Sequence, residues 1–124
     1  MQDRRRAFAA RTSCSLCGLE HLDALLASAP IITLNTNQYD PEILLKAIAS
    51  LPEAQRLNAQ TRAVHAAGWI NGDGALVAVR EDIGRHNALD KLIGALIRAG
   101  QDISVGAICL TSRCSVEMVL KSAR

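Results

Sequence analysis

Aromatic side chains are scarce in this sequence: Phe8, Tyr39 and Trp69 are the only three, 2% of its 124 residues. With so few rings, the chain cannot build the stacked aromatic surface on which single-stranded nucleic acids usually bind. The net charge is small as well, because 14 basic residues against 12 acidic ones leave only +2, too little for a nucleic-acid-binding surface. We therefore expect an aliphatic core and no nucleic-acid partner.

The sequence also lacks a hydrophobic run long enough to cross a membrane, which takes about 20 residues. Its longest apolar stretches, at positions 74–79 and 103–110, have only the length of a strand. The first residues are basic, with arginines at positions 4–6, but no apolar stretch follows them as it would in a secretory signal peptide. We therefore expect a cytoplasmic protein without a membrane partner.

The composition, with 49% hydrophobic and 21% charged residues, is that of a folded globular domain. We expect residues 1–13 to form a flexible basic lead-in and residues 14–124 a single α/β domain. A helical pattern covers positions 17–30, and positions 31–34 form a short candidate strand. The sequence Asp40-Pro41-Glu42 is a typical helix start, and the segment 50–53 predicts that a second helix begins there and runs to about residue 60.

The second half alternates between apolar strands and amphipathic helices. Positions 75–79 and 103–110 predict two buried strands. Between them, apolar residues recur at 89, 92, 93, 96 and 97, the spacing of an amphipathic helix, and Gly100 is expected to end it. A final helix with an apolar face of Val116, Val119 and Leu120 follows. Strand–helix–strand–helix order predicts parallel strand pairing and a layered α-β-α domain of the α/β class.

Only four cysteines are present, Cys14, Cys17, Cys109 and Cys114, too few for the disulfide scaffold of a small secreted domain. Cys14 and Cys17 form a Cys-x-x-Cys at a predicted helix start, where backbone N–H groups and the positive helix end stabilise a thiolate. Such a pair can exchange disulfides, carry a persulfide or supply two metal ligands. The alternative is that both are small buried residues.

A metal site is harder to complete from these residues. His21 lies one helical turn after Cys17 and would be a third ligand from the same segment. The spacing of Cys109 and Cys114 is unusual for zinc, and Cys109 alternates within a predicted strand, which indicates a core position. His65 is not followed by the glutamate that zinc deaminases require. We therefore expect no bound metal ion.

Two polar segments, 80–87 and 111–117, follow the predicted strands. They hold the charged or hydroxyl-bearing candidates Arg85, His86, Ser112, Arg113 and Ser115. Guanidinium groups and helix N-termini bind phosphate, and the carboxyl ends of parallel strands face one crevice. The two segments therefore predict a phosphate-bearing ligand, although no Gly-x-Gly-x-x-Gly or Walker motif is present. Helix capping by Asp82 or Asn87 is the alternative for the first segment.

Three motifs in the chain match a known family in the expected order. They are Cys14-Ser-Leu-Cys17-Gly18, then Val79-Arg-Glu-Asp-Ile-Gly-Arg-His-Asn-Ala-Leu-Asp-Lys91, then Thr111-Ser-Arg-Cys-Ser-Val-Glu-Met118 with Lys121. The middle motif is long and highly specific. From Thr12 onward the chain resembles the formate dehydrogenase accessory sulfurtransferases of the FdhD/NarQ type.

This resemblance implies a sulfur carrier. Its persulfide would come from a cysteine desulfurase, reside on Cys14 with Cys17 as the second thiol, and pass to the molybdenum (or tungsten) bis-guanine-dinucleotide cofactor of formate dehydrogenase. It also implies a cytidine deaminase-like fold, a homodimer and binding of a guanine nucleotide, whose phosphates suit the two polar segments. The alternative is a non-catalytic cofactor-binding chaperone or a Cys-based metal-binding module.

The chain departs from the family pattern in three respects. The family sequence Thr-Gly-Gly-x-His reads Thr61-Arg62-Ala63-Val64-His65 here, so a loop that uses the freedom of glycine is expected to change. A β-rich segment before the cysteine pair and a Gly-Phe segment near the C-terminus are not found. The final helix is expected to run to Arg124 without a cap. These departures predict a shortened member that transfers sulfur poorly by itself.

Overall fold

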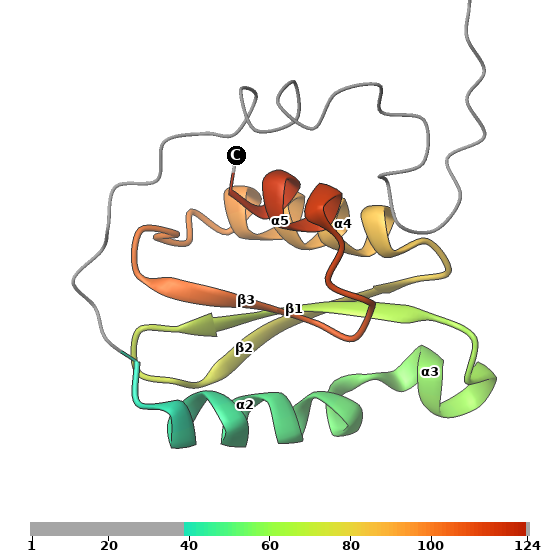
Figure 1. Ribbon diagram of the computed structural model, residues 1–124, viewed down its shortest axis with the longest axis horizontal. Helices are drawn as coiled ribbons and strands as arrows, with labels where there is room; N and C mark the ends of the chain where they lie inside the picture. Colours follow the sequence, from blue (N-terminus) through green and yellow to red (C-terminus); the bar gives the residue numbers. More distant parts are fainter. Residues whose placement is uncertain (1–38, 124) are drawn as a thin grey trace, which may run out of the picture. The chain divides into compact units, whose positions relative to one another are not determined.

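The computed structural model describes residues 39–123, which form three strands and four helices (Figure 1). Their order is α2 (Pro41–Ala54), α3 (Arg56–Thr61), β1 (His65–Asn71), β2 (Leu76–Asp82), α4 (Arg85–Arg98), β3 (Gly106–Leu110) and α5 (Val116–Ser122). The sheet and helices α2 to α4 belong to one compact unit, and α5 belongs to another. The expected lead-in, the helix at 17–30 and the strand at 31–34 lie outside the described residues.

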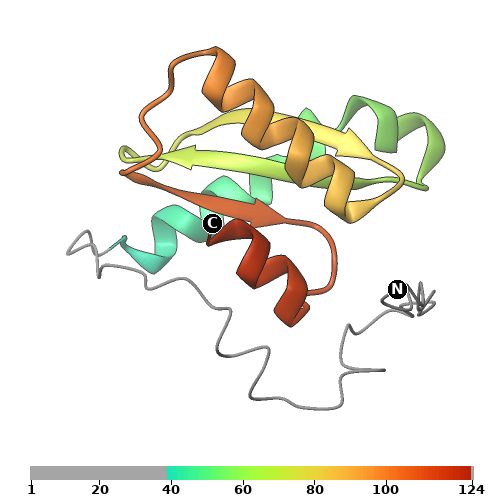
Figure 2. The same ribbon diagram turned by 90° about the horizontal axis from the view of Figure 1, so that it is seen from above.

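The strand order is β2-β1-β3, and β1 is antiparallel to both of its neighbours. The predicted parallel pairing is therefore wrong. The strands expected at 75–79 and 103–110 do run in the same direction (Figure 2). However, β1 lies between them, and each forms its backbone hydrogen bonds with β1. They are observed as β2, which extends to Asp82, and β3, which starts only at Gly106.

A tight turn joins β1 to β2. The Oδ1 atom of Asn71 accepts hydrogen bonds from the backbone N–H groups of Asp73 at 3.1 Å and Ala75 at 2.9 Å. Gly74 has φ +81°, a left-handed conformation that glycine adopts without steric cost. This turn aligns β1 with β2, so that His65 lies opposite Asp82 at the far end of the pair.

Helices cover both faces of the sheet within this unit, as the α-β-α expectation requires. Helices α2 and α3 lie on one face and α4 on the other (Figure 1). Ala47 and Leu51 of α2 form a buried cluster with Ile70 and Cys109. Leu92 of α4 is fully buried. The observed fold is thus a mixed α/β arrangement around a small aliphatic core.

Two helix ends predicted from the sequence are confirmed, and one predicted helix start is wrong. Asp40 caps α2, since its Oδ1 accepts from the Glu42 N–H at 2.9 Å. Gly100, with φ +62°, follows the end of α4; its N–H and that of the next residue bond back to carbonyls of the last turn, as in a Schellman motif. The predicted restart near residue 50 is wrong, because α2 continues through Pro52 to Ala54. The helix is interrupted instead at Gln55, which separates α2 from α3 and has a buried side chain.

Helix α5 is short and has a polar start. The Ser115 hydroxyl accepts from the Met118 N–H at 3.4 Å, which makes Ser115 its N-cap. The helix ends at Ser122 rather than running to the last residue as expected. None of the helices between residues 39 and 123 is long and apolar enough to cross a membrane.

Candidate functional site

Three strand ends meet at one edge of the sheet. Because β1 is antiparallel to its two neighbours, the carboxyl ends of β2 and β3 lie beside the start of β1. His65 pairs with Asp82, and Ala67 pairs with Leu110. The two polar segments singled out in the sequence therefore leave the sheet at the same edge, as expected, although for a different topological reason. We call this region the strand-end edge; it comprises residues 65–66, 82–87 and 111–114.

Thr111 ties the exit of β3 to the start of β1. Its Oγ1 accepts a hydrogen bond from the Ala66 N–H at 2.8 Å. Its own N–H donates to the Ala66 carbonyl at 3.1 Å. These two bonds continue the strand pairing past β3 and fix where the next residues, Ser112 and Arg113, leave the sheet.

The turn between β2 and α4 is organised by one carboxylate. Asp82 Oδ1 accepts from the Gly84 N–H at 2.9 Å and from the Asn87 side-chain amide at 3.2 Å. Its Oδ2 pairs with the Lys91 ammonium at 2.5 Å. The hydrogen bond from Lys91, followed by the Gly84 N–H, lowers the pKa of Asp82 from 3.8 to about 2. Neither Asp82 nor Asn87 caps α4, so the capping alternative is wrong in its simple form.

Helix α4 begins at this turn without a side-chain cap. Gly84 occupies the N-cap position, and the first turn contains no acidic residue. Arg85 and His86 start the helix, where the helix dipole favours an anion. The Arg85 Nε is buried and has no hydrogen-bond partner among residues 39–123. A buried guanidinium donor without a partner is uncommon in folded proteins and is open to an acceptor.

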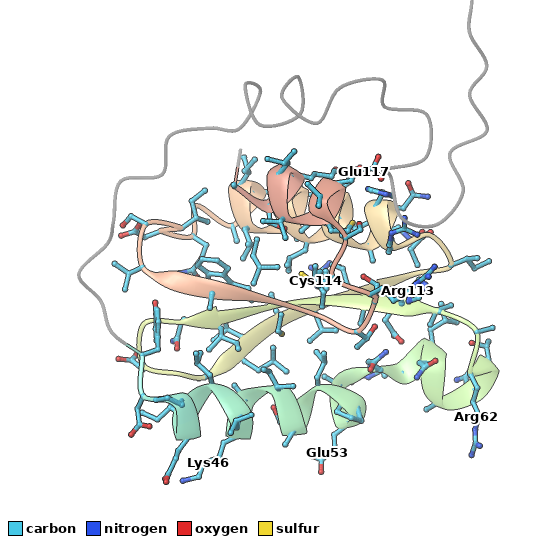
Figure 3. All side chains as sticks on the ribbon, viewed as in Figure 1. Lys46, Glu53, Arg62, Arg113, Cys114 and Glu117 are labelled. Atoms are coloured by element: carbon cyan, nitrogen blue, oxygen red, sulfur yellow. The ribbon has the colours of Figure 1, made fainter. Side chains whose placement is uncertain are left out.

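The segment after β3 presents polar side chains at the same edge. Arg113 and Cys114 are exposed and lie just beyond the end of β3 (Figure 3). Ser112 is partly buried and its hydroxyl donates to the Arg113 carbonyl at 3.4 Å. Ser115 belongs to the other compact unit, where it caps α5. Its role in cofactor binding stays a prediction.

The two downstream cysteines differ in their surroundings. Cys109 is buried in the core, as expected from its place in the strand, and burial raises the pKa of its thiol. Cys114 is exposed. Both line a largely apolar pocket of about 300 Å³ between α2 and β3, together with Ser112 and aliphatic side chains such as Leu44 and Ile48. Cys14, Cys17 and His21 lie outside the described residues.

Sequence reasoning missed the parts that hold this edge together. Strand β1 was not predicted, although the Asn-Gly-Asp-Gly sequence at 71–74 is a hairpin signal. The hydroxyl of Thr111 and the ammonium of Lys91 were seen only as members of a motif. Glu81 was also seen only as a member of a motif, yet its carboxylate accepts from the N–H groups of Leu57 and Asn58, both at 2.8 Å, and thereby caps α3. Within the described part of the chain, no group of three metal-ligating side chains gathers.

Arg62 stands where the family pattern has its first glycine. It is the only non-glycine residue between 39 and 123 with a positive φ, at 49°. Its N–H donates to the Asn58 carbonyl at 2.8 Å and ends α3. The neighbouring Ala63 adopts no such conformation. Of the two positions at which the family pattern has glycine, one therefore has left-handed backbone in this chain.

The sequence profile of the FdhD/NarQ family matches residues 1–124. Two curated relatives, from Cupriavidus necator and Agrobacterium fabrum, are each named sulfur carrier protein FdhD. They are 47% and 44% identical over 99% of this chain. The chain spans less than half of their length, 42% and 45% respectively.

Among solved structures, the chain is similar to a protein from Desulfotalea psychrophila described as a formate dehydrogenase accessory protein. The TM-score is 0.57 with 36% sequence identity, over 65% of this chain and 34% of that one. The match to the family profile, over residues 1–124, includes all three motifs on which the resemblance was based. The chain belongs to the FdhD/NarQ family.

Proposed function

We propose that this chain is the sulfur-carrying part of a sulfurtransferase that serves formate dehydrogenase. The observation that carries the proposal is the 44–47% identity, over 99% of the chain, to relatives named as sulfur carriers. The matched length includes Cys14 and Cys17, whose spacing suits persulfide chemistry. The donor is a cysteine desulfurase and the recipient is the molybdenum (or tungsten) cofactor of the enzyme.

The chemistry needs two thiols. The Cys14 thiolate attacks the terminal sulfur of the donor persulfide; the donor S–S bond breaks, the donor thiolate leaves, and Cys14 holds the sulfur as a persulfide. No net oxidation occurs in this step. To release the sulfur as sulfide, Cys17 attacks the Cys14 sulfur, so that the two cysteines form a disulfide and supply the two electrons that reduce the departing atom.

The strand-end edge is the proposed seat of the substrate cofactor, in its bis-guanine-dinucleotide form. The phosphates of this cofactor would accept hydrogen bonds from Arg85 and His86 at the start of α4. They would also accept hydrogen bonds from Ser112 and Arg113 after β3. The buried, unpartnered Nε of Arg85 supports this assignment, because it calls for an acceptor. The cytidine deaminase-like fold belongs to the same proposal, and helices on both faces of the sheet support it.

Sulfur loading tests this proposal directly. The protein is incubated with a cysteine desulfurase and cysteine, and the mass gain of one sulfur atom is mapped by peptide mass spectrometry. We expect the adduct on Cys14 and its loss in Cys14→Ala. The matched control is Cys114→Ala, which removes another exposed thiol and should load like the parent. Cys17→Ala should load but release less sulfide.

Two results would overturn the assignment. Loading of Cys14→Ala as efficient as that of the parent would place the sulfur elsewhere. Bound zinc in the purified protein, together with no sulfur adduct, would favour the Cys-based metal-binding module instead.

A further inference from the structure

The ion pair between Asp82 and Lys91 has no part in the sulfur chemistry, yet one of its members, Asp82, belongs to the strand-end edge. Asp82 is mostly buried, with a side-chain exposure of 19%, whereas Lys91 is 52% exposed. Lys91 lies in the second turn of α4 and reaches back to the end of β2. There its ammonium also donates to the Glu81 carbonyl at 3.1 Å.

Asp82 fixes the backbone of the turn that places Arg85. Its Oδ1 holds the Gly84 N–H and the Asn87 amide at once. Gly84 is the N-cap of α4, so its position decides where the first N–H groups of the helix point. A carboxylate that binds two donors from one turn leaves that turn little freedom.

The same carboxylate creates an electrostatic difficulty. A phosphate at the start of α4 would approach a full negative charge only two or three residues away along the chain. At a separation of several ångströms near the protein surface, such a charge weakens anion binding by about fivefold. The Lys91 ammonium cancels it, because it contacts the other carboxylate oxygen directly.

We propose that Asp82 and Lys91 are positioning residues of the phosphate site: Asp82 sets the turn, and Lys91 neutralises Asp82 so that a phosphate can bind beside it. This inference rests on the proposed function, since it takes the start of α4 as the seat of the substrate phosphates. It assigns the two residues no contact with the substrate.

The test compares the affinities of GDP and guanosine, because only GDP carries phosphates. Lys91→Met leaves Asp82 uncompensated and should weaken GDP binding about fivefold, with guanosine unchanged. Asp82→Asn keeps an acceptor for Gly84 and removes the negative charge, so GDP binding should not weaken. The double variant Asp82→Asn/Lys91→Met should recover most of the loss, and Lys91→Arg should bind like the parent.

Glu81→Gln is the matched control, since the neighbouring carboxylate caps α3 instead of the turn. It should lower thermal stability and leave the ratio of GDP to guanosine affinity unchanged. A double variant that binds GDP no better than Lys91→Met, or parallel losses for both ligands, would overturn the inference. If the parent binds GDP no better than guanosine, the proposal of a phosphate site at this edge is wrong. Sulfur loading on Cys14 is tested independently, by the mass-spectrometry experiment above.

Discussion

At the scale of single residues, Arg62 carries the clearest backbone strain. Its left-handed conformation costs an L-residue roughly 1–2 kcal/mol. Glycine avoids this cost but loses about 0.4–1 kcal/mol through the greater freedom of the unfolded chain. We therefore expect Arg62→Gly to raise the free energy of unfolding by up to about 1 kcal/mol, measured by urea denaturation.

The comparison for this prediction is Arg62→Ala, which removes the charge and keeps the Cβ. It should leave stability close to that of the parent, because the strain comes from the Cβ and not from the guanidinium. The Arg62 side chain points away from the sheet (Figure 3), so loss of its contacts should contribute little. Equal stabilisation by both substitutions would mean that charge, rather than backbone conformation, is the cause.

At the scale of elements, α4 packs on β1 and β2 and covers one face of the sheet. Leu92 is fully buried there, whereas Ile97, one turn later, is 67% exposed. Leu92→Ala should lower the free energy of unfolding by about 2–5 kcal/mol, because it removes buried methyl groups and leaves a cavity. Ile97→Ala in the same helix should change it by less than about 0.5 kcal/mol. Chemical denaturation of both variants checks this; similar losses would show that α4 does not pack as described.

Elements with strong local signals could be predicted from the sequence. The start of α2 rests on Asp40 and Pro41, and α4 rests on the spacing of its leucines and isoleucines. Strand β1 could not be recognised as easily, because its buried stretch is mostly small: Ala66, Ala67 and Gly68 precede Trp69. The break at Gln55 was misplaced to residue 50 because a proline is typical of the first turn of a helix, whereas α2 continues through Pro52 to Ala54. The cap of α3 comes from Glu81, more than twenty residues away, and no local pattern shows it.

At the scale of the whole molecule, the sequence predicted that the two polar segments meet at one edge of the sheet, but not the strand pairing that brings them together. Arg85, His86, Ser112 and Arg113 were expected at one edge, and the structure brings the segments that carry them there. The expected reason, direct parallel pairing, is wrong. β1 lies between β2 and β3, so the two predicted strands bond to β1 and not to each other. Which strand occupies the central position is decided by tertiary packing, which no local pattern shows. The network of Asp82, Lys91 and Thr111 depends on the same arrangement.

We also propose that the protein is a dimer, as the family resemblance implies. Val116 and Val119 on α5 are apolar and exposed, Val119 by 51%, and a second copy would cover them. Light scattering at micromolar concentration should give the dimer mass, and Val119→Glu should shift it toward the monomer. Ile97→Glu, which places the same charge on an exposed position of α4, is the comparison. A parent that is monomeric under these conditions would contradict the proposal.

The central place of β1 has a consequence for how the site can come into being. β2 and β3 share no hydrogen bonds, so nothing in the sheet aligns their ends except the strand between them. The β1–β2 hairpin is local, but β3 joins it from more than forty residues beyond Ala66, after α4. Forming contacts between residues so far apart in the sequence costs more loop-closure entropy than forming local contacts. The proposed phosphate seat therefore depends on completion of the sheet. A chain released or unfolded before β3 docks has the hairpin, its turn and Arg85, but no edge for Arg113 to share.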